Sequence, residues 1–444
     1  MAAMVMALWV AFSFPLLACG HLVPQEVRSV AYGVSVLTTS GSVRGWYGGD
    51  TTDVASDLEY DVINITNNEY TFGALKSDGS AVFWGTSGWA AIPGDAEKAK
   101  LTSGCSKIVG GYRSFAVLKD DGTVVWFGNL FYHSSFAGVE FADVESSLTN
   151  VVDLFATLDA YAALKPDGSI VTWGVDSRGQ DTTFQGDQSA DLSLGVSTMA
   201  ATDYAFAALL TTGKVICWGN SQYGGTIPAD IVSALSADVV SVTVLDSTET
   251  TYRQHFIATK SDGTTVLWGG YWDRYIGKIY SNFKSVAITN YVVAVLFTDG
   301  TVETQGNSAY GGDASTVYAT ELVTDANVES IRVTGSALAA LKSDGSVFAW
   351  GHSSAGGDTT AVASQLTSGV SSLYSHRFSF SVLKTDGSVV AWGYDGRGNG
   401  VGTADVSSGV VAVHSVLLNM HEHGAMYAVK SVSRWCFKPF PNHF

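Results

Sequence analysis

Four aspartates follow glycine-rich loops of similar sequence: Asp50, Asp181, Asp313 and Asp358. Carboxylate oxygens are ligands that Ca²⁺ prefers, and a ring of such carboxylates would also attract a cationic partner surface. Calcium needs several oxygens that converge on one point, whereas each of these loops supplies one carboxylate. Aspartate in a turn commonly accepts hydrogen bonds from its own backbone. We therefore interpret the four aspartates as turn-forming residues and predict no metal site.

The other reactive residues do not form a recognisable constellation. His421-Glu422-His423 could be read as a pair of metal ligands, but three adjacent side chains point in different directions, so we interpret this stretch as a solvated loop. Cys105, Cys217 and Cys436 are spaced too widely and irregularly for a disulfide framework or a zinc site. The sequence has no Gly-x-Ser-x-Gly elbow, catalytic triad pattern or phosphate-binding loop. We therefore predict no catalytic, cofactor-binding or metal residues and expect no cofactor.

A short phrase returns nine times along the chain, and its clearest copy is ALKSDGSVFAWG at residues 340–351. The mean spacing of the copies is about 43 residues. A period of this size is typical of a chain built from one supersecondary unit stacked on itself. Each copy has one glycine in its turn: Gly41, Gly79, Gly122, Gly168, Gly213, Gly263, Gly300, Gly345 and Gly387.

The phrase predicts a β-hairpin. An Asp-Gly or similar pair between two apolar runs favours a tight turn in which the glycine adopts a positive φ. The turn aspartate therefore has no need to be catalytic. In each repeat a further apolar run precedes the hairpin, so that one repeat supplies three short strands.

Leucine and tryptophan occupy fixed places around the turn. A leucine stands four residues before the glycine in every copy except the sixth, which has Thr259. A tryptophan stands five residues after it, except for Phe127 in the third copy and Gln305 in the seventh. The apolar runs are nearly continuous, which is typical of strands buried on both faces. We therefore predict an all-β fold, a β-propeller of about nine (seven to ten) small antiparallel sheets with one repeat per blade.

After the tryptophan the pattern continues as Trp-Gly-x-x-x-x-Gly-Gln, as in residues 173–180. This frame resembles the regulator-of-chromosome-condensation repeat family, in its compact, bacterial-like branch. The resemblance covers residues 27–400 and implies a propeller, usually of seven blades, so that nine copies are a departure. Family members often carry a structural histidine four residues before the leucine; here His255 has that place, and Ser114 and Ser379 replace it in two copies.

The family resemblance also suggests an activity, the exchange of guanine nucleotide on a small GTPase. Its residues lie on loops without a repeated motif, and we can carry none of them over to this sequence. The formal net charge of −17 makes nucleic acid a poor candidate partner, because phosphate backbones would be repelled. The charge and the apolar N-terminus also speak against a nuclear role.

Residues 1–20 are uncharged and apolar, and we interpret them as a signal peptide. An N-terminal membrane anchor, or a lipid on Cys19, is the alternative and would be the protein's one link to a membrane. We predict a single repeat domain over residues 27–430, with nine clear repeats and a degenerate tenth, and an irregular tail at residues 431–444. Asn64-Ile65-Thr66 is a glycosylation sequon if the chain enters a eukaryotic secretory route.

Three functions remain open from the sequence. The first, which we favour, is a secreted or surface-tethered monomeric scaffold that binds a protein, or less favourably a glycan, through its loop face without catalysis. The second is an intracellular exchange factor or adaptor of the same family, and the third is a propeller enzyme such as a lyase or glycosidase. Exposed aromatics in variable loops would suit a binding face or cap a blade edge, and two such stretches are residues 130–133 and 271–275.

Overall fold

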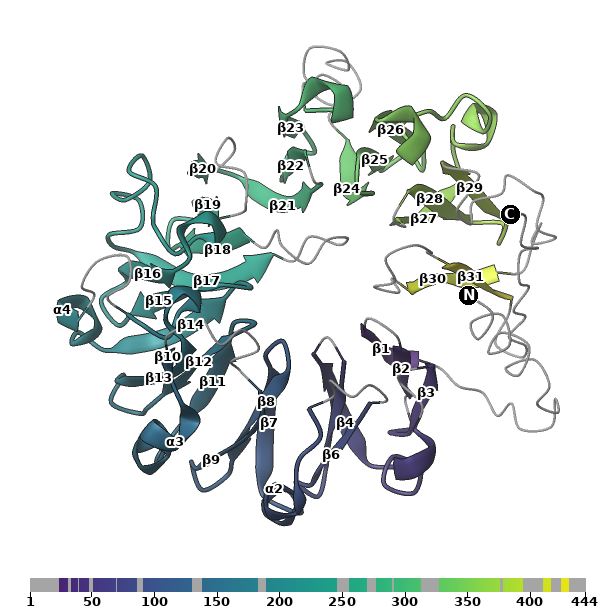
Figure 1. Cartoon of the computed structure of the whole chain (residues 1–444). Helices are drawn as coiled ribbons and strands as arrows, with labels where there is room; N and C mark the ends of the chain where they lie inside the picture. Colours follow the sequence, from purple (N-terminus) through teal and green to yellow (C-terminus); the bar gives the residue numbers. More distant parts are fainter. Residues whose placement is uncertain are drawn as a thin grey trace. The chain divides into compact units, whose positions relative to one another are not determined.

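The computed structural model shows a chain of small antiparallel sheets (Figure 1). It describes residues 24–30, 33–38, 40–47, 51–68, 70–85, 91–129, 138–182, 189–245, 255–269, 277–289, 291–312, 327–375, 378–393, 410–416 and 425–430. The predicted signal peptide with Cys19 and the predicted tail lie outside these residues. No helix in the described ranges combines the length and the apolar character that crossing a membrane requires.

The chain forms two compact units. The first contains three sheets, with strands β1 (Pro24–Val30), β2 (Gly33–Thr38), β3 (Val43–Tyr47), β4 (Val62–Asn67), β5 (Phe72–Lys76), β6 (Ala81–Trp84), β7 (Cys105–Gly110), β8 (Ser114–Lys119) and β9 (Val124–Gly128). Short helices connect them, η1 (Thr52–Val54) and α2 (Asp95–Lys100). The predicted single-domain organisation stays a prediction.

The second unit continues the same pattern of one sheet per repeat. Its strands are β10 (Gly138–Val139), β11 (Asp153–Ala156), β12 (Ala160–Leu164), β13 (Ile170–Val175), β14 (Val196–Ala201), β15 (Ala205–Leu210), β16 (Val215–Gly219), β17 (Val239–Leu245), β18 (His255–Lys260), β19 (Thr265–Gly269), β20 (Lys278–Tyr280), β21 (Phe283–Ile288), β22 (Val292–Phe297), β23 (Val302–Gly306), β24 (Val328–Val333), β25 (Ala337–Lys342), β26 (Val347–Gly351), β27 (Val370–Ser375), β28 (Ser379–Lys384), β29 (Val389–Gly393), β30 (Val410–Val416) and β31 (Ala425–Lys430). Its short helices are α3 (Phe141–Val144), η2 (Glu145–Ser147), η3 (Asp176–Arg178), α4 (Ser189–Leu192), η4 (Ser221–Tyr223), η5 (Ser308–Tyr310), η7 (Ser353–Ala355) and η8 (Ala363–Gln365).

Every described sheet except the last has its three repeat strands in sequence order, all antiparallel. Two sheets gain a fourth edge strand that the repeat does not predict: β10 pairs with β13, and β20 pairs with β19. The last described sheet has only β30 and β31, in the region of the predicted degenerate copy. Within each unit, strands of consecutive sheets contact one another, such as β14 with β17 and β24 with β27. The all-β class and the propeller-type blade, one per repeat, are confirmed.

The hairpin turn has the predicted conformation. The turn glycine has φ between 76° and 84° in all nine copies. The structure adds a second reason for glycine, because in six copies the carbonyl of this residue accepts the N–H of the first strand of the next repeat, as in Val370 to Gly345 at 2.9 Å. A Cβ on Gly168 would lie 2.7 Å from the backbone of Gly195. The turn glycine therefore both forms the hairpin and joins neighbouring repeats.

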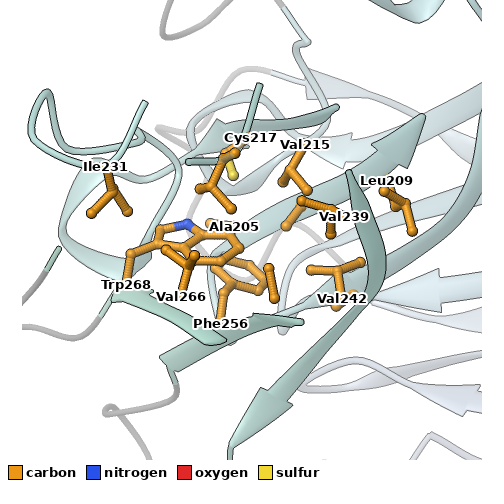
Figure 2. Packing of buried hydrophobic residues seen from close by; sticks show 14 of the residues in the cluster. Ala205, Leu209, Val215, Cys217, Ile231, Val239, Val242, Phe256, Val266 and Trp268 are labelled. Atoms are coloured by element: carbon orange, nitrogen blue, oxygen red, sulfur yellow. The ribbon is translucent and has the colours of Figure 1, made fainter. Parts of the chain in front are cut away.

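The core lies between neighbouring sheets (Figure 2). Trp268 of β19 packs with Leu209 and Val215 of the preceding sheet, and the tryptophan is fully buried. Trp84, Trp173, Trp218, Trp350 and Trp392 are also buried, as are the leucines that precede the turns. This confirms that the fixed leucine and tryptophan fill the interfaces between blades. Burial of an aromatic side chain of this size makes it a major contributor to stability.

Most buried tryptophans have an aromatic partner directly across the hairpin. Phe206 is opposite Trp218 and Phe256 is opposite Trp268, with ring centroids 5.6 Å and 5.3 Å apart. In the copy that has Gln305 instead of tryptophan, the residue opposite is Val293. Trp350 has the aliphatic Leu338 opposite it, so the aromatic pair is common but not obligatory at this interface.

The lysine two residues before the turn aspartate bonds to the segment that joins its own sheet to the preceding one. Lys260 donates from Nζ to the carbonyl of Ala234 at 3.0 Å, and Lys384 donates to the carbonyl of Gln365 at 2.8 Å. Both carbonyls lie at the end of a helical turn, where backbone acceptors lack a partner within the turn. The lysine of the repeated phrase thus has a structural role that the sequence analysis did not assign.

Candidate functional site

Of the four aspartates that follow glycine-rich loops, the structure describes Asp181 and Asp358. Asp358 closes its own turn, since its Oδ1 accepts the N–H of Thr360 at 2.9 Å and the hydroxyl of Thr360 at 2.6 Å. These hydrogen bonds lower the pKa of Asp358. The turn interpretation is therefore confirmed for Asp358. For Asp181 the turn interpretation stays a prediction. Asp50 and Asp313 lie outside the described residues.

Most other candidate stretches also lie outside the described residues: residues 130–133, 271–275 and 421–423. In the described part of the chain, no three His, Cys, Asp or Glu side chains are grouped so that they could hold a metal ion. Cys105 and Cys217 are free and buried, and His255 is buried at the start of β18. Cys217 packs in the core between two sheets, as expected for a small apolar residue.

The two ends of each sheet carry different structural elements. One end carries the Asp-Gly turns, whose glycine carbonyls bond to the next repeat. The other end carries the loop between the first and second strands and the helical turn after the third strand. We call it the loop end; its clearest parts are residues 157–160, 202–205, 289, 291–292 and 334–337 with the turns η3, η4, η5 and η7.

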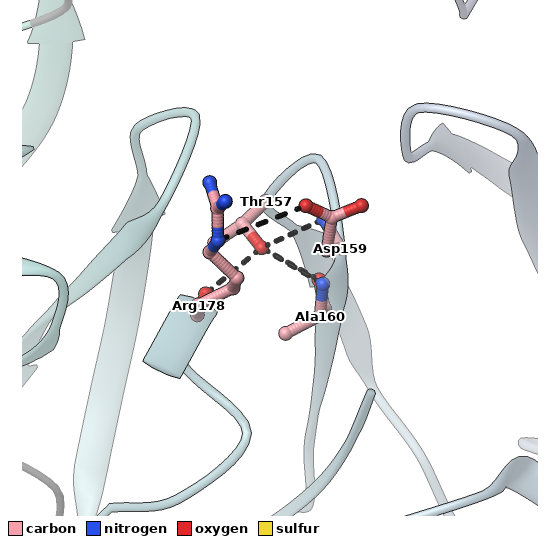
Figure 3. A network of polar contacts seen from close by, with 4 residues as sticks. All are labelled: Thr157, Asp159, Ala160 and Arg178. Atoms are coloured by element: carbon pink, nitrogen blue, oxygen red, sulfur yellow. Dashed lines mark hydrogen bonds and ion pairs between the residues drawn. The ribbon is translucent and has the colours of Figure 1, made fainter. Parts of the chain in front are cut away.

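A threonine holds the two parts of the loop end together. Thr157 Oγ1 accepts the N–H of Ala160 at 2.9 Å and donates to the carbonyl of Arg178 at 3.0 Å (Figure 3). Thr202 bonds the carbonyl of Tyr223 at 2.9 Å, and Thr334 bonds that of Ala355 at 3.0 Å. Each of these threonines stands seven residues before the leucine of the repeat, a signal that was present in the sequence and was missed.

The helical turn is fixed to the next repeat as well. Gly179, which ends η3, has φ 114° and accepts a hydrogen bond from Trp218 Nε1 at 2.8 Å. The same bond links Trp392 to Gly356 at 2.8 Å. The turns η3 and η7 therefore contact two sheets through hydrogen bonds. Side chains on such a turn are presented on a rigid support, which binding sites require.

Two positions of the loop end differ between repeats while the framework stays the same. One is five residues before the leucine and the other is nineteen residues further on. Because both lie at the same end of one sheet, they form a pair in each repeat. The described pairs are Asp159 with Arg178, Tyr204 with Tyr223, Tyr291 with Tyr310, and Ser336 with Ala355.

The side chains of three of these pairs are in contact. Arg178 Nε lies 4.0 Å from the carboxylate of Asp159, and the guanidinium of Arg178 lies 3.7 Å from the centre of the Tyr204 ring. Tyr204 and Tyr223 meet edge to face with centroids 4.6 Å apart. Cation–π contacts of this kind orient both side chains. The loop ends of the fourth and fifth repeats thus share one connected group of side chains, in which Arg178 and Tyr204 are half-buried and Tyr223 is buried.

A second aromatic group lies at the loop end of the seventh and eighth repeats. Tyr291 and Tyr310 are stacked with centroids 3.9 Å apart, and Tyr310 is also stacked with His352 at 5.5 Å. A third group, in the first unit, places the guanidinium of Arg113 5.2 Å from the Tyr70 ring and 5.1 Å from the Tyr112 ring. Tyrosine and arginine are therefore a common feature of the loop end.

Two carboxylates flank Arg178 on its turn. Burial raises the pKa of Asp176, and the charge of Asp181 raises it further. The turn therefore retains a proton on Asp176 to higher pH than an isolated aspartate would. This charged environment distinguishes the fourth repeat from the seventh, whose loop end is neutral at residues 305–312.

Residues 196–224 match a known family, described as "Regulator of chromosome condensation (RCC1) repeat". These residues span β14, β15, β16 and η4, which is one complete sheet with its loop end. The other repeats share its hairpin register and turn geometry. This repeat is of the regulator-of-chromosome-condensation type. The resemblance drawn from the sequence is thereby confirmed.

Several solved structures resemble parts of this chain. The CRINKLY WD40 ectodomain of the Arabidopsis thaliana receptor kinase ACR4 is 17% identical, covering 63% of this chain and 97% of that chain, with a TM-score of 0.33. Prp20p from Saccharomyces cerevisiae is 14% identical, covering 68% and 77%, with a TM-score of 0.31. AztD from Citrobacter koseri is 10% identical, covering 77% and 91%, with a TM-score of 0.32. No curated protein matches the sequence. Likenesses this distant do not transfer a function.

Proposed function

We propose that this propeller-type scaffold is non-catalytic and binds a protein partner through the loop end of its sheets. One observation carries the proposal: the paired positions vary in side chain while the threonine, glycine and tryptophan that support them recur. A surface that is constant in framework and variable in side chains is suited to specific recognition.

The composition of the loop end supports a protein as the partner. Tyr204 and Arg178 are residue types that contribute most to binding energy in protein interfaces. Arg178 is held in place by Tyr204 and Asp159, so that little conformational entropy is lost when a partner binds. The side chains of Arg178 and Tyr204 are therefore already oriented in the unbound protein.

The experiment compares capture of proteins by the intact chain and by two matched variants. The double variant Arg178→Ala/Tyr204→Ala removes the aromatic and cationic surface, whereas Tyr60→Ala removes an exposed tyrosine next to the Asp-Gly end. We expect a specific protein to be captured by the intact chain and by Tyr60→Ala, and to be lost with the double variant. Equal capture by all three, or equal loss from both variants, contradicts the proposal.

We propose further that the chain acts outside the cytoplasm, secreted or tethered to the cell surface. The apolar residues 1–20 support this part of the proposal. N-terminal sequencing of the mature protein from its native cells tests it. A mature chain that starts near Gly20 supports export, whereas an intact Met1 in a soluble cytoplasmic fraction favours the intracellular adaptor or exchange factor.

A further inference from the structure

Tyr291, Tyr310 and His352 form an exposed group of nearly parallel rings, which we call the aromatic column. The planes of Tyr291 and Tyr310 differ by 17°, and those of Tyr310 and His352 by 19°. Tyr291 is 38% exposed, and His352 is exposed. One face of the Tyr291 ring is covered by Tyr310, so its exposed area lies on the other face and the edge.

The support of the column is rigid. Tyr310 ends η5, whose first residues are capped by Asn307, because Asn307 Oδ1 accepts the N–H of Ala309 at 3.0 Å. Thr289 Oγ1 accepts the N–H groups of Tyr291 and Val292 at 3.0 and 2.9 Å. The turn η5 lies against β26, which ends next to His352. The rings therefore keep their arrangement in the absence of a ligand.

The two loop segments that carry Tyr310 and His352 are polar, and an aspartate follows each of them in the sequence, Asp313 and Asp358. Residues 305–312 and 351–357 contain no Asp, Glu, Lys or Arg. Asn307, Ser308 and Ser353 are exposed. Ser354 Oγ and His352 Nδ1 are hydrogen-bonded at 2.8 Å. The column is thus bordered by amide and hydroxyl groups that both donate and accept hydrogen bonds.

We propose that the aromatic column binds the sugar rings of a neutral carbohydrate. A pyranose presents a face of C–H groups, which are attracted to the negative face of an aromatic ring, and a rim of hydroxyls that both donate and accept. The Tyr291 ring supplies the face, and Asn307, Ser308 and Ser353 supply the partners for the rim. An anionic ligand would find no described cation within residues 305–312 or 351–357, and a cationic ligand no carboxylate.

This site is separate from the surface of Arg178 and Tyr204 on which the proposed protein binding rests. It lies on other repeats, and its ligand belongs to another chemical class. Either proposal can therefore fail while the other holds. A chain that binds sugar through Tyr291 and captures no protein through Arg178 and Tyr204 would support the carbohydrate site alone.

The test is calorimetric titration of the intact chain with cellohexaose, chitohexaose and mannohexaose, and with a trigalacturonate as a charged comparison. We expect saturable binding of at least one neutral hexasaccharide. Tyr291→Ala should weaken it about tenfold, because one aromatic face is lost. Tyr291→Phe should keep the affinity within about threefold, since the ring remains.

Tyr60→Ala is the matched control, because Tyr60 is a more exposed tyrosine, 57%, and belongs to the other compact unit. Its affinity for sugar should equal that of the unaltered chain. Circular dichroism of Tyr291→Ala verifies that the sheets are intact. The proposal is overturned if no neutral hexasaccharide binds, if Tyr291→Ala and Tyr60→Ala bind alike, or if only the trigalacturonate binds.

Discussion

The hairpin aspartates illustrate how a repeated charged residue serves structure. In seven copies the aspartate accepts hydrogen bonds from the residue two positions further on, and these bonds lower the pKa of Asp78, Asp121, Asp167, Asp262, Asp299, Asp344 and Asp386. A carboxyl whose pKa is lower in the folded state stabilises the fold above its unfolded pKa, here 3.8. That contribution disappears as pH falls through the folded pKa.

We therefore expect the protein to lose stability progressively below about pH 4, where these carboxylates become protonated. Urea midpoints measured between pH 7 and pH 2.5 test this. Asp344→Asn should lower the midpoint at pH 7 and reduce its loss on acidification, since the charged acceptor is gone. Asp57→Asn, outside the hairpin turns, is the control. An Asp344→Asn profile parallel to that of the unaltered chain would contradict the role assigned to the turn carboxylate.

The described cysteines lead to a prediction about reactivity. Burial raises the pKa of both thiols, Cys105 and Cys217, so that the reactive thiolate is scarce. In a Cys19→Ser/Cys436→Ser background we expect almost no labelling by a thiol reagent at pH 8. Two thiols should react after denaturation in urea. Rapid labelling of the native protein would show that the blade interfaces open readily.

Between neighbouring sheets, the indole N–H of tryptophan has a measurable role. Trp218 Nε1 donates to the buried turn at Gly179, whereas Trp173 Nε1 has no hydrogen-bond partner among the described residues. Trp218→Phe should therefore cost about 1–3 kcal/mol, because a buried carbonyl loses its donor. Trp173→Phe should cost less, since both variants lose similar volume but only one loses a hydrogen bond. Urea unfolding of the two variants compares them, and equal losses would refute the role of the bond.

The threonine of the loop end offers a sharper test of the support for the binding surface. Thr157→Val removes a hydroxyl that bonds the backbone of both Ala160 and Arg178 without a large change in shape. We expect a loss of about 2 kcal/mol in the free energy of unfolding and faster hydrogen exchange in η3. Thr157→Ser keeps the hydroxyl and should stay close to the unaltered chain. If serine and valine are equally destabilising, the methyl group and not the hydrogen bonds is responsible.

The sequence was sufficient to predict the parts of the fold that depend on spacing within one repeat. Leu209, Trp268 and the turn at Gly213 follow from periodicity and turn chemistry, and all three have the predicted place. The pairing of Tyr204 with Tyr223 was not predicted, because it depends on a hairpin register and a helical turn nineteen residues away. The edge strand β10 has only two residues and no local signal.

The function was less accessible for the same reason. A repeat shows where residues are constant, and the constant residues of this chain serve packing. Arg178 and Tyr291 stand at positions that no single residue type occupies in all described copies, so no invariant motif marks them. Their contacts with Tyr204 and Tyr310 appear only when the loop ends are assembled. Local sequence identified the framework, and tertiary structure was needed to find the surface.

The whole chain should respond to damage locally, because each sheet contacts mainly its neighbours. In such arrays stability is approximately a sum of the stabilities of single repeats and of nearest-neighbour interfaces. Trp268→Ala removes a fully buried side chain from the interface of β15 and β16 with β18 and β19, and should cost about 3–5 kcal/mol there. Hydrogen exchange followed by mass spectrometry should show loss of protection in these four strands. The core around Trp392 and Phe380, which belongs to a separate cluster, should keep its protection under the same conditions. A uniform loss across both clusters would mean instead that the second unit unfolds as one cooperative block.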